Sequence, residues 1–408
     1  MEKQAVKYLE IIREQVLKEM DISRELTDIE IYEMIDGFII DISKEAYIGL
    51  ESKNILRTEV FNSLRKLDIL QELVDDNTVT EIMVNGTDAI FVERAGHLYR
   101  WDKVFQNKDK LQDVIQQIVA RTNRVVNEST PIVDSRLENG ARVNVVLPPA
   151  AINGPILTIR RFPDKPITME ALLHWNSITK EAADFLKKLV IAGYNIFISG
   201  GTGSGKTTFL NALSDFIPKD ERIITIEDSA ELQIYGIENL VKLETRNANV
   251  EGCSAITIRD LIKCALRMRP DRIIIGEVRG IEAIDLIQCL NTGHDGSLST
   301  GHANSAKDML SRLETMILMG MDIPMNAVRR QLESGIDIIV HLGRLRDKSR
   351  KVLEIVEITG FNNGDIITAP LFLFEEASDS TSEKVVGNLN MVGELEGMGK
   401  LKTAGIRL

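Results

Sequence analysis

Hydrophobic residues recur at helical spacing through the first 63 residues of the chain. The first such stretch repeats every three or four positions, as in an amphipathic helix. Thr27 and Glu30 have the spacing of a capping box, so a second helix is expected to begin there. We predict a small helical module over residues 1–63, whose apolar faces either form a local core or dock on a membrane partner. The repeating positions of the first helix are Val6, Leu9, Ile12, Val16 and Met20.

Between residues 64 and 165 the pattern mixes helix and strand. Asn85-Gly86 separates two alternating runs in the manner of a hairpin turn. Pro163 and Pro166 then interrupt the periodicity. We therefore predict an α+β domain over 64–165, followed by a linker over 166–177. The expected elements of this domain are strands at 81–84, 89–93, 142–147 and 156–162 and a helix at 111–121.

From residue 178 to residue 375, strand-like runs alternate with helical runs. This alternation is typical of an α/β fold with a largely parallel sheet. Residues 376–408 are rich in Gly, Ser, Asp and Glu and are expected to form a flexible, solvated tail. The expected strands are 195–199, 222–226, 239–245, 272–275, 297–300 and 336–341, with further strands between 352 and 374.

Residues 200–207 read Gly-Gly-Thr-Gly-Ser-Gly-Lys-Thr and fit the phosphate loop G-x-x-x-x-G-K-[ST]. The loop follows an apolar strand and precedes a helical run, which is the context that the motif requires. Backbone N–H groups would face the phosphates, Lys206 would neutralise the β and γ charge, and Thr207 would hold Mg²⁺. We predict a RecA-like P-loop NTPase core over 178–375. ATP is expected to bind through Gly200, Gly201, Thr202, Gly203, Ser204, Gly205, Lys206, Thr207 and Thr208.

Two later strands end in carboxylates. The first is followed by Glu227, Asp228 and Glu231, and the second ends in Gly276-Glu277. An ordinary Walker B strand would close with Asp at the position of Gly276. Here Mg²⁺ must therefore be reached by Glu277, directly or through water.

The segment 292–304 contains His294 and His302 beside a predicted strand. Two histidines are too few for a zinc site, and the cysteines lie at the wrong spacing to complete one. A lone histidine is usually a structural donor, but a histidine paired with glycines near a γ-phosphate can sense whether that phosphate is present. The three cysteines lack CxxC spacing and are expected to be buried thiols in a reducing compartment: Cys253, Cys264 and Cys289.

The chain carries a formal net charge of −12 and has a sequence pI near 5.2, which disfavours broad contact with nucleic acid. Residues 1–20 are charged throughout, and no run reaches the 18 apolar residues that a membrane span needs. We expect a cytoplasmic protein that is neither exported nor integral. A partner would have to hold it at a membrane.

The four motifs, in this order, resemble those of the type II and type IV secretion ATPase superfamily. Within it the CpaF-like proteins, which assemble tight-adherence (Flp) pili, are the most similar branch. The resemblance runs from about residue 60 to residue 361. The family's Walker A loop, acidic box, Gly-Glu Walker B strand and His box correspond to residues 200–207, 226–231, 273–277 and 292–304.

The resemblance implies roles for individual side chains. Glu231 is similar to the family's water-activating carboxylate, with Glu227 beside it. Glu277 is similar to the Walker B glutamate, and His294 and His302 to the His-box pair. Together with Lys206, these residues form the expected catalytic set, with Thr207 and Glu277 toward the metal.

Segments 134–143 and 158–162 resemble the family's N-terminal arginine segment. In the family such arginines reach the phosphates from the preceding domain and stabilise charge in the transition state. The resemblance points to Arg142 and Arg160 as catalytic residues, with Arg136 and Arg161 as their neighbours. The competing interpretation is that they are ordinary surface residues of a strand.

The resemblance further implies a homo-hexameric ring at the inner face of the cytoplasmic membrane. Hydrolysis in such a ring moves the N-terminal domain against the core and works on an inner-membrane platform protein, driving pilus assembly or protein secretion. Two alternatives stay open at this point. One is a conjugation or nucleic-acid translocating ATPase, which low aromatic content disfavours, and the other is a nucleotide-binding regulator without turnover.

Overall fold

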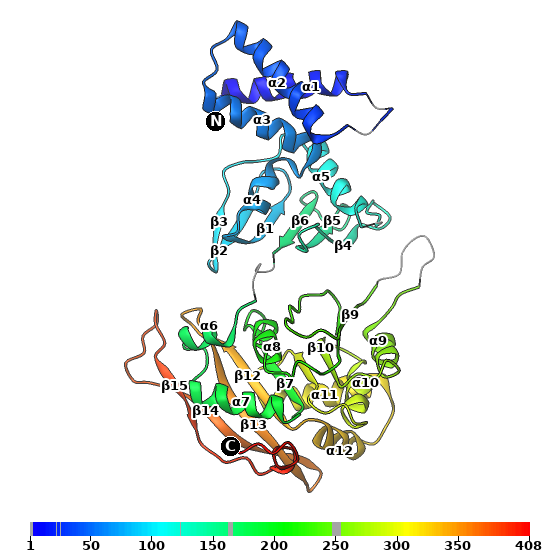
Figure 1. Cartoon of the computed structure of the whole chain (residues 1–408), viewed down its shortest axis with the longest axis vertical. Helices are drawn as coiled ribbons and strands as arrows, with labels where there is room; N and C mark the ends of the chain where they lie inside the picture. The colour runs from blue at the N-terminus through cyan, green and yellow to red at the C-terminus, as the bar shows by residue number, and fades with distance from the viewer. Residues whose placement is uncertain (1–2, 22, 25, 123, 162–165, 247–253) are drawn as a thin grey trace. The chain divides into compact units, whose positions relative to one another are not determined.

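The computed structural model describes residues 3–21, 23–24, 26–122, 124–161, 166–246 and 254–408. The chain divides into two compact units, Met1–Pro163 and Asp164–Leu408, each with its own hydrophobic cores (Figure 1). Phe162, at the end of a predicted strand, and Cys253 lie outside the described residues.

The first unit begins with three helices that pack pairwise on one another. Their shared core buries apolar side chains of all three helices, including Ile12, Ile31 and Val60. The predicted capping box is present, because Thr27 Oγ1 accepts from the Glu30 backbone N–H (3.3 Å) and the Glu30 carboxylate accepts from the Thr27 N–H (2.8 Å). The helices are α1 Lys3–Glu19, α2 Asp28–Glu45 and α3 Leu50–Arg65.

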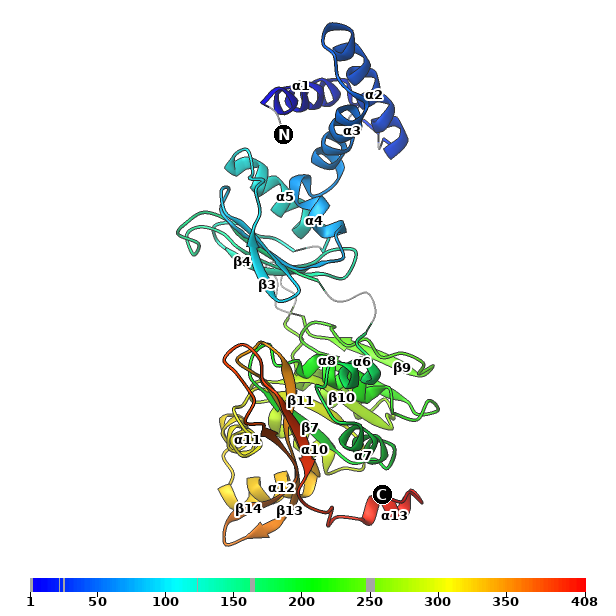
Figure 2. The ribbon, with the colours of Figure 1, turned by 90° about the vertical axis from the view of Figure 1, so that its left-hand side faces the viewer.

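A six-stranded antiparallel sheet forms the rest of this unit, with strand order β3-β2-β1-β6-β5-β4. Helices α4 and α5 cover one face of it, where Leu111, Ile115 and Ile118 of α5 pack on buried strand residues (Figure 2). The elements are the short helix η1 Asp68–Leu70, α4 Gln71–Asp75, α5 Lys108–Ala120, and strands β1 Val79–Asn85, β2 Ile90–Arg94, β3 His97–Arg100, β4 Ile132–Arg136, β5 Arg142–Val146 and β6 Ile156–Arg160.

The second unit is built on a nine-stranded sheet of order β15-β14-β13-β12-β7-β11-β10-β8-β9. The six strands from β12 to β9 run parallel, as the alternating pattern predicts, and β13 to β15 extend the sheet in antiparallel fashion. The strands are β7 Ile196–Gly200, β8 Ile223–Glu227, β9 Leu240–Glu244, β10 Arg272–Val278, β11 Leu298–Gly301, β12 Ile338–Arg344, β13 Arg350–Asn362, β14 Asp365–Glu376 and β15 Gly387–Met391.

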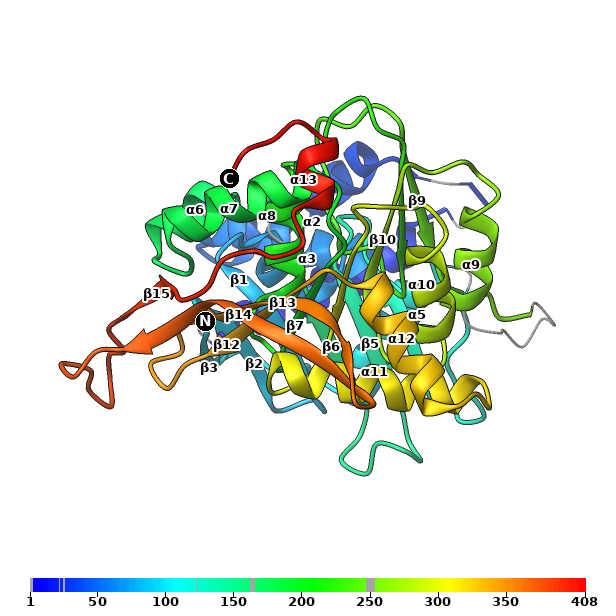
Figure 3. The same ribbon diagram turned by 90° about the horizontal axis from the view of Figure 1, so that it is seen from below.

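Helices cover both faces of the sheet (Figure 3). Ile196 and Ile198 of β7 pack against α6, α7 and α8, whereas Phe197 between them packs against the layer formed by α9 to α12. Burial on both faces explains why the central strands are continuously apolar. The helices are α6 Met169–His174, α7 Lys180–Ile191, α8 Lys206–Ser214, α9 Ile258–Ala265, α10 Ala283–Leu290, α11 Ala306–Gly320, α12 Met325–Gly335 and α13 Gly399–Thr403.

The region expected to be a linker, residues 166–177, differs from the prediction. Thr168 accepts from the Ala171 backbone N–H and begins helix α6. Met169 and Leu172 of this helix are buried in the core of the second unit. Pro166 therefore lies just before a short helix, and α6 belongs to the core of the second unit.

The predicted flexible tail after residue 375 is also wrong. Strand β15 pairs with β14, and Leu395 and Leu401 are buried in the core. The carboxylate of Glu357 accepts from the backbone N–H groups of Glu396 (2.8 Å) and Gly397 (2.6 Å). The prediction relied on the polar composition of this segment and overlooked the few leucines that pack into the core.

The structure describes two of the three cysteines, which were expected to be buried. Cys289 is buried, and burial raises the pKa of its thiol to about 12, so it is unreactive. Cys264 is exposed, against the expectation of burial. Among the described residues, no helix is both long enough and apolar enough to cross a membrane.

Candidate nucleotide-binding site

The phosphate loop joins the end of β7 to the start of α8. Gly205, immediately before α8, has a φ of 95°, in the left-handed region that favours glycine. At Gly200 a Cβ atom would lie 2.5 Å from the Leu342 carbonyl oxygen, so no side chain fits there. The glycines at these two positions are thus required by backbone geometry.

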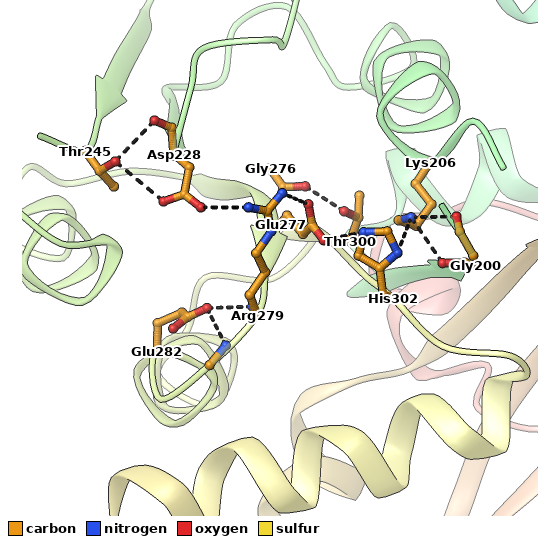
Figure 4. A network of polar contacts seen from close by, with 12 residues as sticks. Gly200, Lys206, Asp228, Thr245, Gly276, Glu277, Arg279, Glu282, Thr300 and His302 are labelled. Atoms are coloured by element: carbon orange, nitrogen blue, oxygen red, sulfur yellow. Dashed lines mark hydrogen bonds and ion pairs between the residues drawn. The ribbon is translucent and has the colours of Figure 1, made fainter. Parts of the chain in front are cut away.

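Lys206, the first residue of α8, is buried within the loop it follows (Figure 4). Its Nζ donates to the carbonyl oxygens of Gly200 (3.1 Å) and Gly201 (3.0 Å) and lies 3.2 Å from Nδ1 of His302. Burial lowers the pKa of this ammonium below its ordinary value. Phosphate oxygens entering the loop would supply the negative charge that these neutral acceptors lack.

His302 connects Lys206 to the Walker B glutamate (Figure 4). Burial, followed by the charge of Lys206, lowers the pKa of His302, so the imidazole is neutral at pH 7. A neutral ring can accept from Lys206 at Nδ1, and its Nε2 lies 2.8 Å from Glu277 Oε1. The two histidine nitrogens therefore link the phosphate loop to the carboxylate.

Arg279 continues this chain of contacts. Its guanidinium donates to Glu277 Oε2 (2.7 Å) and lies 3.6 Å from a carboxylate oxygen of Asp228. Asp228 follows β8 and Glu277 lies in β10, so Arg279 joins the carboxyl ends of two neighbouring strands. The sequence interpretation did not assign Arg279 a role, although it lies two positions after Glu277.

Glu227 is almost completely buried, and its carboxylate supports the loop that carries Glu231. Glu227 Oε2 accepts from the backbone N–H groups of Glu231 (2.7 Å) and Leu232 (2.9 Å). A Cβ atom at Gly276 would lie only 2.9 Å from Cγ of Glu227. The unusual glycine of the Walker B strand therefore makes room for Glu227, which explains why an aspartate is absent there.

Burial raises the pKa of Glu227 from 4.5 to about 7. The folded chain thus binds this proton more tightly than the unfolded chain, so the stability that Glu227 contributes falls as pH rises from about 4.5 to about 7. The shift corresponds to about 3 kcal/mol.

Glu227→Gln keeps a side-chain oxygen for the two N–H groups and removes this titration. We expect the free energy of unfolding of Glu227→Gln, relative to that of the unsubstituted chain, to increase by up to about 3 kcal/mol between pH 5 and pH 8. Urea denaturation at pH 5, 6, 7 and 8 measures this difference. Parallel stability curves for the two proteins would show that Glu227 does not titrate in this range.

The hydroxyl of Thr207 and the carboxylate of Glu277 are suitable ligands for a hydrated Mg²⁺ ion. Thr207 lies in the first turn of α8 and offers a hydroxyl, the usual P-loop ligand. Both carboxylate oxygens of Glu277 already contact other side chains, His302 and Arg279. Because Mg²⁺ retains several waters, Glu277 can bind it through water while keeping these contacts.

Two hollows flank the phosphate loop. A polar cleft of about 860 Å³ is lined by residues that include Gly201, Thr202, Arg279, His302 and Arg312. A smaller pocket of about 250 Å³ lies beside Ser204 and Thr208. Its walls include Leu172, Trp175, Phe209, Leu342 and Arg350. The cleft suits phosphates, whereas the smaller, mostly apolar pocket suits a base or ribose.

The structure does not bring His294 to this network. His294 precedes β11 and its Nδ1 lies 3.3 Å from the Cys289 carbonyl oxygen, whereas His302 follows β11 beside Lys206. Strand β11 runs between them, parallel to β7. The two histidines therefore lie at opposite ends of β11. Of the two, His302 is the one next to the phosphate loop.

Three of the arginines in the first unit form a row across neighbouring strands. Arg142 of β5 is paired directly with Arg160 of β6 and with Arg136 of β4. Paired residues of antiparallel strands share one face of the sheet, so Glu81 of β1, which is paired with Arg160, lies on the same face as this row. Arg161 differs, because its guanidinium donates to the Asp76 carbonyl oxygen and to Asn77 Oδ1.

Comparison with known proteins identifies the family. The family model described as "Type II/IV secretion system protein" matches residues 63–384. The chain belongs to this family. Conjugal transfer protein TrbB of Rhizobium radiobacter is 34% identical over 315 residues, 76% of this chain and 93% of that protein. Type IV secretion system protein PtlH of Bordetella pertussis is 33% identical over 317 residues, 71% of this chain and 93% of that protein.

Solved structures agree with the fold of this family. The ATPase DotB of Legionella pneumophila superposes with a TM-score of 0.52 at 21% identity, covering 71% of this chain and 80% of that chain. The pilus retraction motor PilT with bound ADP gives 0.51 at 20% identity, covering 74% and 81%. The fold is therefore the predicted mixed α/β architecture with a RecA-like core.

Proposed function

We propose that this chain is a Mg²⁺-dependent ATPase that drives pilus assembly or protein secretion through an inner-membrane platform protein. The observation that carries the proposal is the contact chain from the phosphate loop through Lys206 and His302 to Glu277. It joins Lys206, which would meet the phosphates, to Glu277, which would hold Mg²⁺ through water. A phosphate loop that only bound nucleotide would not need this connection.

In the proposed reaction, Glu231 accepts the proton of the attacking water. Glu227 positions Glu231 through the backbone N–H groups at 231 and 232. Lys206 stabilises charge on the β and γ phosphates, and His302 responds to the γ-phosphate through its contact with Lys206. Mg²⁺, held by Thr207 and through water by Glu277, would neutralise further phosphate charge.

Arg142 and Arg160 complete the proposed set. Arg142 is paired with both Arg136 and Arg160, so the three arginines share one face of the first unit's sheet, on which Glu81 is paired with Arg160. Guanidinium groups can stabilise the charge on a transferring phosphoryl group. We propose that these arginines stabilise the transition state of hydrolysis, and that the working form is a homo-hexamer at the cytoplasmic face of the inner membrane. Within the family, we propose a tight-adherence (Flp) pilus role.

A conjugation role is the second candidate, favoured by the 34% identity to conjugal transfer protein TrbB. The formal charge of −12 argues against direct contact of this chain with DNA. ATP turnover measured with and without single-stranded DNA separates the two candidates. Stimulation by DNA would favour the nucleic-acid alternative, whereas an unchanged rate supports filament assembly or secretion.

Glu231→Gln is expected to bind ATP normally and to reduce kcat by roughly 100-fold or more, because it removes the proposed general base. Nucleotide binding by fluorescence and phosphate release at steady state measure the two effects separately. The matched variant is Glu238→Gln, which removes an exposed carboxylate from the same connection and should leave kcat within about twofold. If Glu231→Gln kept full turnover, the general base would lie elsewhere.

A further inference from the structure

The turn between β12 and β13 lies beside the phosphate loop. Arg350, at the start of β13, donates from Nε to the Gly203 carbonyl oxygen (2.8 Å). A Cβ atom on Gly205 would lie 3.4 Å from Cδ of Arg350, so the side chain lies along the loop. This contact is made by a strand that follows the phosphate loop by about 140 residues.

The turn is fixed by its own residues and by the base of β13. The carboxylate of Asp347 accepts from the Ser349 backbone N–H (3.0 Å). The backbone N–H of Val352 donates to the Ser177 carbonyl oxygen (2.9 Å), which ties β13 to the segment after α6. These hydrogen bonds fix the backbone on either side of Arg350.

The C-terminal segment also contacts this turn. Arg346 Nε donates to the Thr381 carbonyl oxygen (2.8 Å), and its guanidinium pairs with the carboxylate of Glu376. The backbone N–H of Val385 donates to Asp347 (2.8 Å). Residues 376–386, expected from sequence to be part of a solvated tail, thus contact the turn through Arg346 and Asp347.

Arg350 and Lys206 hold different parts of the same loop. Lys206 bonds to the carbonyl oxygens of Gly200 and Gly201, and it would exchange these for phosphate oxygens when nucleotide binds. The Arg350 bond to Gly203 does not involve Lys206, so it can persist in the bound state. A glycine-rich loop loses much backbone entropy on ordering, and a contact that orders it beforehand raises affinity.

We propose that Arg350 is a positioning residue of the phosphate loop, and that residues 376–386 hold it in place through Arg346 and Asp347. The inference rests on the proposed nucleotide binding at this loop. It assigns the C-terminal segment a part in nucleotide affinity. Arg350 contacts the loop and lines the smaller pocket rather than meeting a particular phosphate, so its effect is expected to be the same for ADP and ATP.

The test measures the Kd of the full chain for ADP and for a non-hydrolysable ATP analogue, together with KM and kcat for ATP. Arg350→Ala is expected to weaken both affinities and raise KM by about tenfold, the size of one charge-assisted hydrogen bond, with kcat within about twofold. Arg350→Lys should recover part of the loss, and Arg346→Ala should weaken binding in the same direction by about threefold. Arg407→Ala removes an exposed arginine outside the turn and serves as the control.

Unchanged affinity in Arg350→Ala would overturn the proposal. A loss confined to the ATP analogue would also overturn it, since Arg350 would then act on the γ-phosphate, and an unaffected Arg346→Ala would remove the role of residues 376–386. Thermal melting checks that the variants remain folded. Failure of the underlying function is distinguishable, because in that case the unsubstituted chain itself would not bind nucleotide.

Discussion

Lys206→Ala is expected to leave less than about one hundredth of the ATP turnover of the unsubstituted chain. Lys206 supplies the positive charge that opposes the β and γ phosphates, and electrostatic stabilisation accounts for most of phosphoryl-transfer catalysis. The substitution also separates the phosphate loop from His302 and Glu277, because Lys206 Nζ is the atom that contacts the ring. Phosphate release at saturating ATP measures the effect.

Lys219→Ala is the matched control for this experiment. Lys219 lies beyond the end of α8, and its Nζ donates to the Tyr235 carbonyl oxygen at the surface. Its removal is expected to change turnover by less than about twofold. Residual activity in Lys206→Ala above about a tenth of the unsubstituted rate would contradict the assignment of the phosphate loop as the hydrolytic site.

The phosphate loop could be predicted from sequence because its glycines and lysine are set by local backbone geometry. The reason why position 276 is a glycine could not be predicted in the same way. Sequence shows only that an aspartate is missing, whereas the reason is the carboxylate of Glu227, which comes from a neighbouring strand and fills the space. A contact between strands some 50 residues apart leaves no local pattern.

The two histidines of segment 292–304 show the same limit. They are eight positions apart and were expected to act together, but β11 carries the chain across the sheet between them. Strand direction, which sequence spacing does not reveal, decides that only His302 contacts Lys206.

The C-terminal segment was mispredicted for a different reason. Composition averages over many residues, and about half of those after 375 are polar or charged. A few isolated apolar side chains, among them Leu389 and Leu401, nevertheless fill the core, and buried carboxylates such as Glu357 satisfy the backbone around them. These contacts join residues that are far apart in the sequence, so the composition of the segment does not predict them.

Arg142→Ala and Arg160→Ala are expected to bind ATP nearly normally and to reduce kcat by roughly 1,000-fold, the usual effect of removing an arginine that stabilises phosphoryl transfer. Arg161→Ala is the matched control, because its guanidinium is engaged by Asp76 and Asn77 within its own unit. Its kcat should fall by no more than a few-fold. Full turnover in both Arg142→Ala and Arg160→Ala would assign the arginine row a purely structural role.

The most direct test of the account compares ATP binding and turnover in the full chain with those of the second unit alone, Asp164–Leu408. The fragment keeps α6, whose Met169 and Leu172 belong to its core, together with the whole phosphate loop. If arginines of the first unit serve hydrolysis, the fragment will bind ATP with similar affinity but turn it over at less than about one hundredth of the full-length rate. A folded fragment that hydrolyses ATP at the full-length rate would contradict the proposal that both units take part in catalysis.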